Sequence, residues 1–252
     1  MDLSYLNRVV AFIDVLGFES LVKKLDADSN LHQKLHCALK RIKSCKLYSL
    51  SNLASNGVEV SVFSDSIVIS AKQDNYKMVI WTAIRLQCDL LALGILVRGG
   101  IACGKTVHEK DILYGEGMLS AYKLEKEAAI YPRIIIDPSV LEFSDESHSH
   151  LFFEKDFDGL CYLNPFSMGI LPSDADELAA DGYDPYHEGL MTLSKVIDLE
   201  ITKLSSLGHL AKWHWLKNKL KLAIVEFKKH GKPMFWHLFE ISKFNCLTDD
   251  KS

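Results

Sequence analysis

The chain has 252 residues, of which 48% are hydrophobic and 25% are charged, and its formal net charge is −4. This composition is typical of a globular protein with enough apolar residues for one large domain, or for a domain with an extension. The small negative charge and an isoelectric point near 6.2 argue against a general nucleic-acid binder and against a binder of acidic membranes. They do not exclude one small anionic ligand held by a local group of basic residues.

The cysteines and the N-terminus indicate a cytoplasmic protein. Six cysteines occur without a Cys-x-x-Cys pair, which favours reduced thiols over disulfides or a zinc site. The first residues, MDLSYLNR, lack the basic start and the apolar block of a signal peptide. No segment approaches the ~18 uninterrupted apolar residues of a membrane-spanning helix. We therefore expect a soluble protein in the cytoplasm, with no membrane partner and no nucleic-acid partner.

The first predicted elements are a strand and a helix separated by a glycine. Arg8 to Val15 is a short, β-branched apolar run without alternation, which predicts a strand buried on both faces. Gly17 ends this strand, and the following residues, FESLVKKL, predict an amphipathic helix. A second helical pattern covers residues 31–53.

A hairpin, a long helix and a strand with adjacent glycines are predicted next. Residues 58–63 and 67–71 have the pattern of two strands joined by a tight turn. Residues 75–93 predict a helix. The strand over residues 96–102 contains an adjacent glycine pair that begins at Gly99. Such a pair allows a ligand or another backbone to approach closely, or serves only for packing.

A further helix and a buried strand complete the predicted core. Residues 117–129 predict a helix, and residues 133–137 predict another buried strand. The order of elements predicts an α+β fold with a ferredoxin-like βαββαβ core, one helix added in the first crossover, and a further helix and strand appended.

The remaining residues predict an extension of a different character. We place the core at residues 1–143 and the C-terminal extension at residues 144–252. The extension begins with a hairpin over residues 151–171 and an acidic loop over residues 172–188. Two amphipathic helices, the second rich in aromatic residues, follow the loop. We expect this extension to pack on the core or on a partner subunit.

Two aspartates lie in otherwise apolar, β-branched runs. Asp14 is in the run VVAFIDVLGF, and Asp65 is in the run VEVSVFSDSIVIS. A carboxylate is costly to bury unless something cationic neutralises it. Two such aspartates, each followed by a turn or a helix start, predict a shared divalent cation. The alternative, that each is an ordinary turn or helix-capping residue, stays open.

Four segments together resemble the class III nucleotidyl cyclases. FIDVLGFESL is similar to their first metal-binding motif, and VFSDSIVIS is similar to the hairpin turn that carries their second metal aspartate. VRGGIACGKTV resembles their R-x-G-I-x-x-G segment, and YGEGMLSAYKLE resembles the helix that supplies their transition-state residues. The four segments follow in the order of that family.

Within this superfamily the chain most resembles the Pycsar branch, bacterial anti-phage cyclases that make cyclic UMP or cyclic CMP. The resemblance rests on Phe63 to Ser66, where common cyclases have Gly-Asp, and on Glu125. The later segment Tyr131 to Ile134 and the aromatic C-terminal helices also resemble the Pycsar branch.

The resemblance implies a two-metal site. Asp14, Asp65 and the backbone carbonyl of Val15 would bind two Mn²⁺ or Mg²⁺ ions, since hard cations prefer carboxylate and carbonyl oxygens. The helix start at Gly17 and Phe18 would direct N–H groups at the β- and γ-phosphates of a nucleoside triphosphate. In this superfamily the metal aspartates and the later helix residues come from different subunits. The resemblance therefore also implies a homodimer with sites at the subunit interface.

The chain departs from the purine cyclases at three positions. Purine cyclases carry Asn and Arg one turn apart where this chain has Leu119 and Lys123. Lys123 can still bring positive charge to the transition state, or it is an ordinary surface lysine. Arg98 or Arg133 would then assist with the phosphate charge and the ribose. Ser61 replaces the purine-reading lysine of adenylyl cyclases, which is compatible with a pyrimidine base.

We therefore predict a homodimeric enzyme that converts UTP to 3′,5′-cyclic UMP and pyrophosphate by two-metal phosphoryl transfer, as a signal in anti-phage defence. The preference for UTP over CTP follows from the resemblance alone. A cytidylate cyclase, a catalytically silent cyclase-like domain that binds nucleotide, and a structural dimerisation module are the alternatives.

Overall fold

The computed structural model describes residues 5–33, 35–36, 58–109, 112–144, 152–167 and 184–231. Residues 29–33 and 35–36 are helical, but most of the second predicted helix and most of the acidic loop lie outside the described residues. Within these ranges, no helix is both long and apolar enough to cross a membrane. The cysteines at positions 88, 103 and 161 are free thiols.

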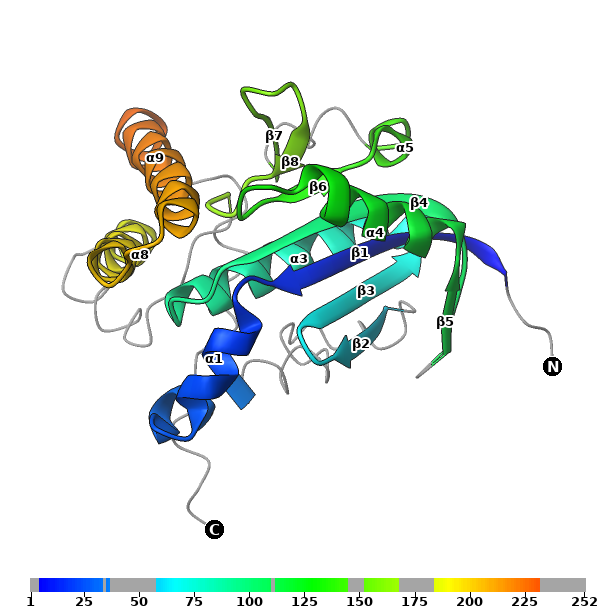
Figure 1. The fold of residues 1–252 in the computed structure, drawn as a ribbon. Helices are drawn as coiled ribbons and strands as arrows, with labels where there is room; N and C mark the ends of the chain where they lie inside the picture. The colour runs from blue at the N-terminus through cyan, green and yellow to red at the C-terminus, as the bar shows by residue number, and fades with distance from the viewer. Residues whose placement is uncertain are drawn as a thin grey trace, which may run out of the picture.

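A sheet of eight strands forms the centre of the described structure (Figure 1). Its first four strands are β1 (Leu6–Val15), β2 (Glu59–Phe63), β3 (Ser66–Lys72) and β4 (Val97–Glu109). They lie in the order β2-β3-β1-β4, and each neighbouring pair is antiparallel. This is the strand order of a ferredoxin-like βαββαβ unit, so the predicted α+β fold class is confirmed.

The sheet continues beyond β4 with shorter strands. β6 (Ile134–Ile136) lies parallel to β4, and β5 (Ile112–Gly115) pairs with the second half of β4. β8 (Cys161–Leu163) pairs with β6, and β7 (Phe153–Lys155) forms the outer edge. The hairpin predicted within residues 151–171 is therefore a continuation of the core sheet.

Helices cover both faces of the sheet. α3 (Tyr76–Ala92) packs on one face and α4 (Glu116–Ala128) crosses the other (Figure 1). The remaining helical segments are α1 (Phe18–Leu25), the short η2 (Gln73–Asn75), α5 (Pro138–Leu141), α8 (Pro185–Thr202) and α9 (Leu207–His230).

The apolar run of β1 is buried on both faces, as its lack of alternation predicts. The odd-numbered residues from Val9 to Ile13 belong to the main core with α3, whereas Val10 and Phe12 lie in a second cluster with Ala121 of α4. Successive side chains of a strand point to opposite faces. Asp14, two residues after Phe12, therefore lies on the α4 face.

Gly100 allows α4 to pack closely on β4. A Cβ atom at this position would lie 2.4 Å from the carbonyl oxygen of Ala121 and 2.5 Å from Cβ of Leu124. Any larger residue would therefore displace the helix. Of the predicted uses for the glycine pair, close approach of another backbone is the one that the structure shows.

The two C-terminal helices contribute to the main core. Leu190 and Ile197 of α8, and Trp213 and Leu216 of α9, are buried in the same cluster as the sheet residues. Both helices lie at the end of the sheet where β1 leads into α1 (Figure 1). The domain boundary at residues 143 and 144 stays a prediction.

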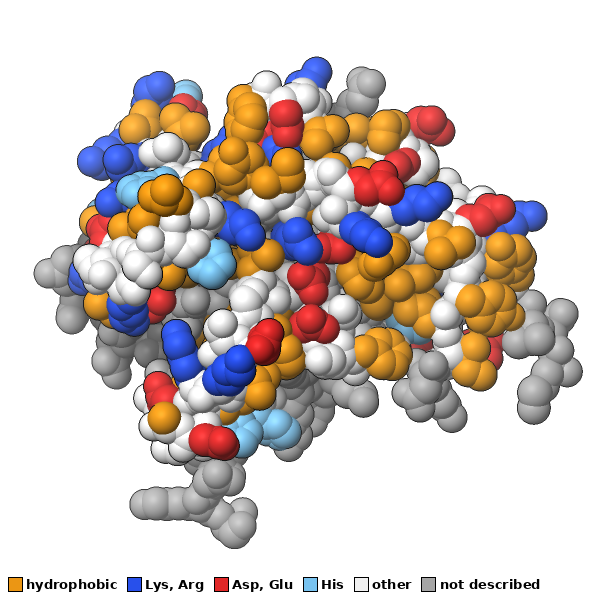
Figure 2. Space-filling model, viewed as in Figure 1, with side chains coloured by type: hydrophobic (Ala, Val, Ile, Leu, Met, Phe, Trp, Pro, Cys, Tyr) orange, Lys and Arg blue, Asp and Glu red, His pale blue; other side chains and the backbone are white. Residues whose placement is uncertain are grey.

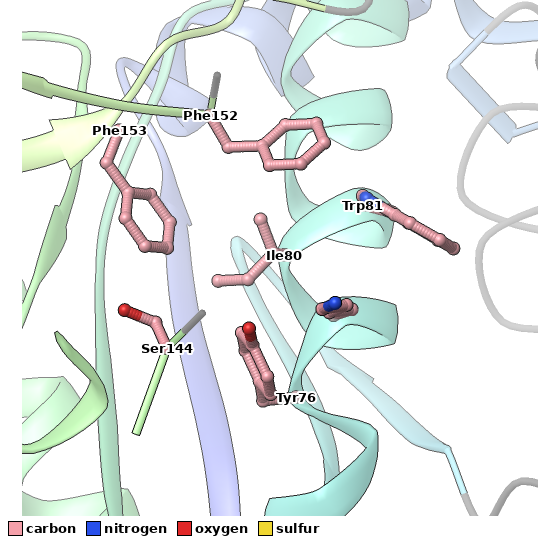
Figure 3. Close-up of a pocket in the computed structure, with 7 residues that line it drawn as sticks. Tyr76, Ile80, Trp81, Ser144, Phe152 and Phe153 are labelled. Carbon is pink, nitrogen blue, oxygen red and sulfur yellow. The ribbon is translucent and has the colours of Figure 1, made fainter. Parts of the chain in front are cut away.

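A small hollow lies between α3 and the segment that leads into β7 (Figure 3). Its volume is about 10 Å³, which is about the space that a single water molecule needs. Mostly aromatic and apolar side chains surround it, among them Tyr76, Ile80, Trp81, Ser144, Phe152 and Phe153. We interpret it as a packing gap and not as a substrate site.

Candidate functional site

Asp14 lies at the end of β1, on the α4 face of the sheet. In the strand register it is opposite Arg98 of β4 on one side and Ser66 of β3 on the other. Residues directly opposite in antiparallel strands point to the same face. The side chain of Asp14 is 20% exposed, so it is shielded but still accessible to a ligand.

Asp65 lies in the two-residue turn that joins β2 to β3. Phe63 and Ser66 pair across this turn. Ser64 has φ +53°, a left-handed conformation that residues other than glycine seldom adopt and that often occurs at functional sites. The carbonyl oxygen of Asp65 accepts a hydrogen bond from the N–H of Val15, at 2.9 Å. The turn is thereby attached to the end of β1.

Arg98 lies between Asp14 and a buried glutamate of α4. Nε of Arg98 is 2.7 Å from Oε1 of Glu125 and 3.5 Å from Oδ2 of Asp14. Within the described residues, neither this Nε nor this Oε1 has a well-directed hydrogen bond, so the contact is an ion pair of poor geometry. Buried polar atoms left in this way are rare in native proteins.

Acidic groups dominate the electrostatics at this end of the sheet. Burial raises the pKa of Asp14, the charge of Arg98 lowers it, and the charge of Asp65 raises it again, with a raised pKa as the net result. The pKa of Glu125 is also raised, mainly by burial and further by the charges of the neighbouring carboxylates. The charge of Arg98 lowers this pKa but offsets the other effects only in part. Besides Arg98, Lys212 acts on Asp14 and Lys126 acts on Glu125, so the three carboxylates have basic neighbours and their mutual repulsion is offset in part.

The oxygen atoms at this position fit a divalent cation. The carboxylates of Asp14 and Asp65 and the carbonyl of Val15 are the hard donors that Mg²⁺ and Mn²⁺ prefer. Within the described part of the chain, no group of three or more His, Cys, Asp or Glu side chains is arranged to hold a metal. Mg²⁺ is usually held by one or two carboxylates together with substrate phosphates, and the pair of aspartates matches that arrangement.

The start of α1 follows Asp14 after three residues. Gly17, the N-cap residue, has φ +71°, which favours glycine. No described side chain caps the helix, so the first-turn N–H groups are available to an anion. Phe18 packs against the main core and fixes this turn in place.

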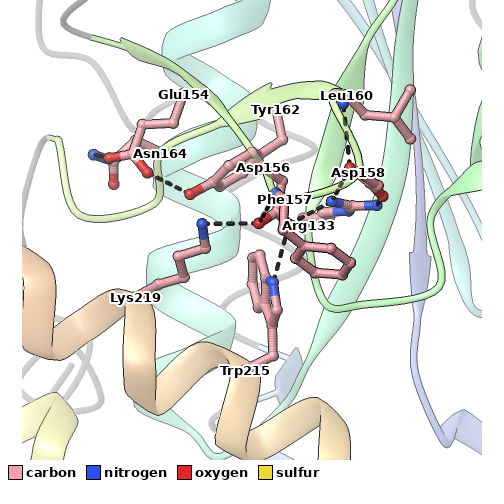
Figure 4. A network of polar contacts seen from close by, with 10 residues as sticks. All are labelled: Arg133, Glu154, Asp156, Phe157, Asp158, Leu160, Tyr162, Asn164, Trp215 and Lys219. Atoms are coloured by element: carbon pink, nitrogen blue, oxygen red, sulfur yellow. Dashed lines mark hydrogen bonds and ion pairs between the residues drawn. The ribbon is translucent and has the colours of Figure 1, made fainter.

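Arg133 is fully buried in a separate polar network (Figure 4). Its guanidinium forms ion pairs with Asp156 and Asp158 from the segment between β7 and β8. The indole N–H of Trp215, on α9, donates to Asp156 at 3.0 Å. Arg133 therefore joins the sheet to the C-terminal helix. Of the two arginines predicted to offset phosphate charge, only Arg98 lies beside Asp14.

Ser61 is buried in another polar network on the α4 face. Its hydroxyl is hydrogen-bonded to Nε2 of His108 at 2.9 Å, and Nδ1 of the same ring is 2.8 Å from Oγ of Ser70. Nε of Arg8 donates to Oγ of Ser70 at 2.9 Å. Ser61 is in register with Val68 and Phe12, so it lies on the Asp14 face of the sheet, two residues from the row of Asp14, with its hydroxyl held by His108.

We expect the stability of the protein to fall between about pH 6.5 and pH 4 because of His108. Burial and, second, the positive charge of Arg8 lower the pKa of His108 to about 4. The unfolded chain binds a proton on this ring near pH ~6.5, whereas the folded chain resists protonation down to about pH 4. The free energy of unfolding therefore decreases with falling pH in this window, by at most ~1.4 kcal/mol per pH unit.

Urea unfolding of wild type and His108→Gln at pH 7 and pH 5 measures this effect. The wild type should lose more stability between the two pH values than the variant does. An equal loss in both proteins would contradict the assignment.

Lys123 lies on the outer side of α4. The residues of α4 that face the sheet are Gly117, Ala121 and Glu125, and Lys123 is two positions, or roughly 200°, from Glu125 around the helix. Leu119, on the same outer side, is 60% exposed. Lys123 therefore points away from Asp14 of its own subunit.

The structure thus gathers most of the predicted site residues at one end of the sheet: Asp14, Val15, Gly17, Phe18, Asp65 and Arg98. Arg133 lies in the separate network with Asp156 and Asp158, Lys123 lies on the outer side of α4, and the hydroxyl of Ser61 is hydrogen-bonded to His108.

Two charged residues near Asp14 were not predicted as site residues. Glu125 has a signal in the sequence, because it continues at a spacing of four the stripe of small residues Gly117 and Ala121. An acid on such a buried stripe indicates an internal ion pair. Lys212 of α9 also acts electrostatically on Asp14, but nothing in the local sequence marks it.

The chain matches no known family profile and no curated protein sequence. Similar solved structures include a bacterial light-regulated adenylyl cyclase, at 16% identity and a TM-score of 0.39, covering 64% of this chain and 52% of that one. The chain therefore spans about half the length of that protein.

Two further similar structures are also cyclases. The catalytic core of a rhodopsin-guanylyl cyclase with converted specificity, in complex with ATPαS, has 15% identity and a TM-score of 0.40, covering 55% of this chain and 80% of that one. The adenylyl cyclase CyaB from P. aeruginosa has 14% identity and a TM-score of 0.39, covering 62% and 91%. Because the identities and TM-scores are low, this likeness carries no argument for function.

Proposed function

We propose that the chain is a class III nucleotidyl cyclase, which converts a nucleoside triphosphate to a 3′,5′-cyclic nucleotide and pyrophosphate. The hydrogen bond from the N–H of Val15 to the carbonyl of Asp65 carries this proposal, because it holds both aspartates at one end of the sheet, beside the start of α1. In the reaction, the 3′-oxygen forms a bond to the α-phosphorus and its proton goes to solvent. The bond from that phosphorus to the bridging oxygen breaks, and pyrophosphate leaves.

The residues at this end of the sheet have different roles in the proposed reaction. Asp14, Asp65 and the carbonyl of Val15 would hold two Mn²⁺ or Mg²⁺ ions, which would supply Lewis acidity at the phosphate and the 3′-hydroxyl. The first-turn N–H groups after Gly17 bind the terminal phosphates. Arg98, with its side chain 30% exposed, offsets negative charge on the phosphates. Catalysis then consists mainly of positioning and charge stabilisation.

We further propose that the enzyme is a homodimer with its sites at the subunit interface. Three large apolar side chains on the α4 side of the sheet are 39% to 60% exposed: Phe63, Leu119 and Tyr122. Figure 2 shows apolar surface gathered on this face, over β1, β3 and β5. A second copy would cover such a patch, and its own outward-facing Lys123 would then lie near the first subunit's phosphates.

For the substrate we propose UTP, and for the role, a cyclic UMP signal in anti-phage defence. The turn from Phe63 to Ser66 and the serine at position 61 in place of a purine-reading lysine support a pyrimidine base, whereas the choice of UTP over CTP rests on the resemblance alone. Cytosine differs from uracil at C4, which carries an amino donor instead of a carbonyl acceptor, and at N3, which accepts instead of donating, so CTP is the closest competing substrate.

The test is incubation of the purified full chain with ATP, GTP, CTP and UTP in separate reactions with Mn²⁺, followed by chromatography and mass spectrometry. We expect cyclic UMP and pyrophosphate in equal amounts. Cyclic CMP alone would overturn the choice of base but keep the reaction class. A cyclic purine nucleotide would overturn pyrimidine selectivity, and no product from any substrate would overturn the enzyme assignment.

A catalytically silent domain that binds nucleotide is the second candidate. The exposed Leu119, where purine cyclases have a polar Asn, favours it. This candidate predicts Mn²⁺-dependent binding of UTP in equilibrium dialysis without any turnover.

A further inference from the structure

A cleft of about 160 Å³ lies between α1 and α9, beside the end of β1. Gly17, Ser20 and Lys24 line it from the side of α1, and His209 and Lys212 line it from α9. One water molecule needs ~10–15 Å³ of this space, so the cleft has room for on the order of ten waters. The cleft can therefore hold phosphate groups.

The charges that line this cleft favour an anion. Lys24 and Lys212 are basic, and His209 lies beside them. The one acid that lines the cleft, Glu200, is already paired with Lys203 at 2.6 Å. In the described part of the chain, neither lysine ammonium at positions 24 and 212 has a hydrogen bond or an ion pair. No described carboxylate contacts either ammonium directly, and the charge of Lys212 is offset only at longer range, by Asp14.

Lys212 connects this cleft to the predicted metal site. Its charge is one of those that lower the pKa of Asp14, and burial followed by the charge of Arg98 lowers the pKa of Lys212 itself. The ammonium is therefore within electrostatic reach of both residues. Figure 2 shows Lys and Arg side chains beside the acidic ones across the middle of this face. A triphosphate whose α-phosphate lies near Asp14 would extend its terminal phosphates into the cleft.

The buried network of Figure 4 holds α9 in position. The indole N–H of Trp215 donates to Asp156 at 3.0 Å, and Nζ of Lys219 is 2.9 Å from the same carboxylate. Trp215 is three residues after Lys212, and Lys219 is four residues after Trp215. The three side chains therefore share one face of the helix. The face of α9 that is anchored to the core is therefore the face that carries Lys212.

We propose that Lys212, from the C-terminal helix, binds the terminal phosphates of the nucleoside triphosphate within the same subunit. The C-terminal extension is then part of the substrate site and not only a packing element. Lys24 and the first-turn N–H groups of α1 contact the phosphates from the opposite wall of the cleft. This inference rests on the proposed function for the identity of the nucleotide, but the anion site itself can be tested without turnover.

The test is isothermal titration of the full chain with inorganic tripolyphosphate, without added metal and at fixed ionic strength. The variants are Lys212→Met and, as a matched control, Lys221→Met, nine residues further on the opposite, exposed side of α9. We expect Lys212→Met to weaken binding by ~10- to 100-fold, the effect of losing one charge-assisted hydrogen bond. Lys221→Met should bind as the wild type does, and Lys212→Arg should restore most of the affinity.

Failure of this inference can be distinguished from failure of the proposed function. If wild type cyclises a nucleotide but tripolyphosphate binds equally to the two methionine variants, the inference is overturned and the cyclase stands. If no nucleotide is turned over but Lys212→Met alone loses tripolyphosphate, the phosphate site stands and the cyclase fails. Where turnover is present, Lys212→Met should raise KM for the nucleotide more than it lowers kcat. If Lys212 were merely structural, the substitution would lower the thermal unfolding temperature without raising KM more than it lowers kcat.

Discussion

Asp14→Asn is expected to abolish cyclisation, lowering kcat by ~10³-fold or more, because several kcal/mol of metal-dependent charge stabilisation would be lost. The substitution preserves the shape of the side chain. It should not unfold the protein, because the pKa of Asp14 is raised first by burial and its ionised form is therefore disfavoured in the folded state. The measurements are initial rates with Mn²⁺ and, in parallel, urea unfolding.

The matched control is Asp26→Asn, which removes an exposed carboxylate just after α1 and should leave kcat unchanged. Asp65→Asn should be as damaging as Asp14→Asn. The double variant should be little worse than either single one, since groups that act as a unit are not additive. Cyclisation at near wild-type rates in either single variant would remove the basis of the two-metal proposal.

Asp156→Ala should lower the free energy of unfolding by ~3–5 kcal/mol, the cost of removing one partner from a buried ion-pair network. Arg133 is fully buried, and Asp156 is the one carboxylate that contacts Arg133, Trp215 and Lys219 together. Urea unfolding at pH 7 measures the change. Asp158→Ala is the matched control, because Asp158 pairs with the same arginine but is 31% exposed, and its loss should cost about 1 kcal/mol.

The contribution of Asp156 to the free energy of unfolding should also depend on pH. Burial alone raises its pKa, but hydrogen bonds from Lys219 and from the N–H of Phe157, together with the charges of Lys219 and Arg133, outweigh burial and lower it overall. A carboxylate with a lowered pKa stabilises the fold above pH ~3.9 and loses that contribution as the pH falls further. Wild type and Asp156→Ala should therefore converge in stability below pH ~4, and a constant difference down to pH ~3 would count against the ion pair.

The elements that position the aspartates could be predicted because local patterns determine them. The unbroken β-branched run up to Val15 predicts a strand covered on both faces, and the glycine that follows predicts where the helix begins. Asp14 and Asp65 could be singled out because a carboxylate in an apolar run needs a partner. Their common location at one end of the sheet then follows from the order of the strands.

The partners of the arginines could not be predicted, since they depend on contacts between distant segments. Arg98 is the second residue of β4 and Arg133 directly precedes β6, so the two look equivalent in the sequence. Arg98 meets Asp14 because of the register of β1 and β4, whereas Arg133 meets Asp156 and Asp158 because a later hairpin extends the sheet beside it. Lys212 is brought to the site only by the packing of α9, which no local pattern encodes.

The hydrogen bond between Val15 and Asp65 links two segments about fifty positions apart into a single rigid frame. The electrostatic repulsion between the carboxylates of Asp14 and Asp65 is thus overcome during folding, when the sheet forms. In the proposed reaction it would not have to be overcome again at each turnover. A preorganised pair of this kind needs little reorganisation when nucleotide arrives. Substitutions that loosen the turn would then slow the chemistry without removing a single ligand oxygen.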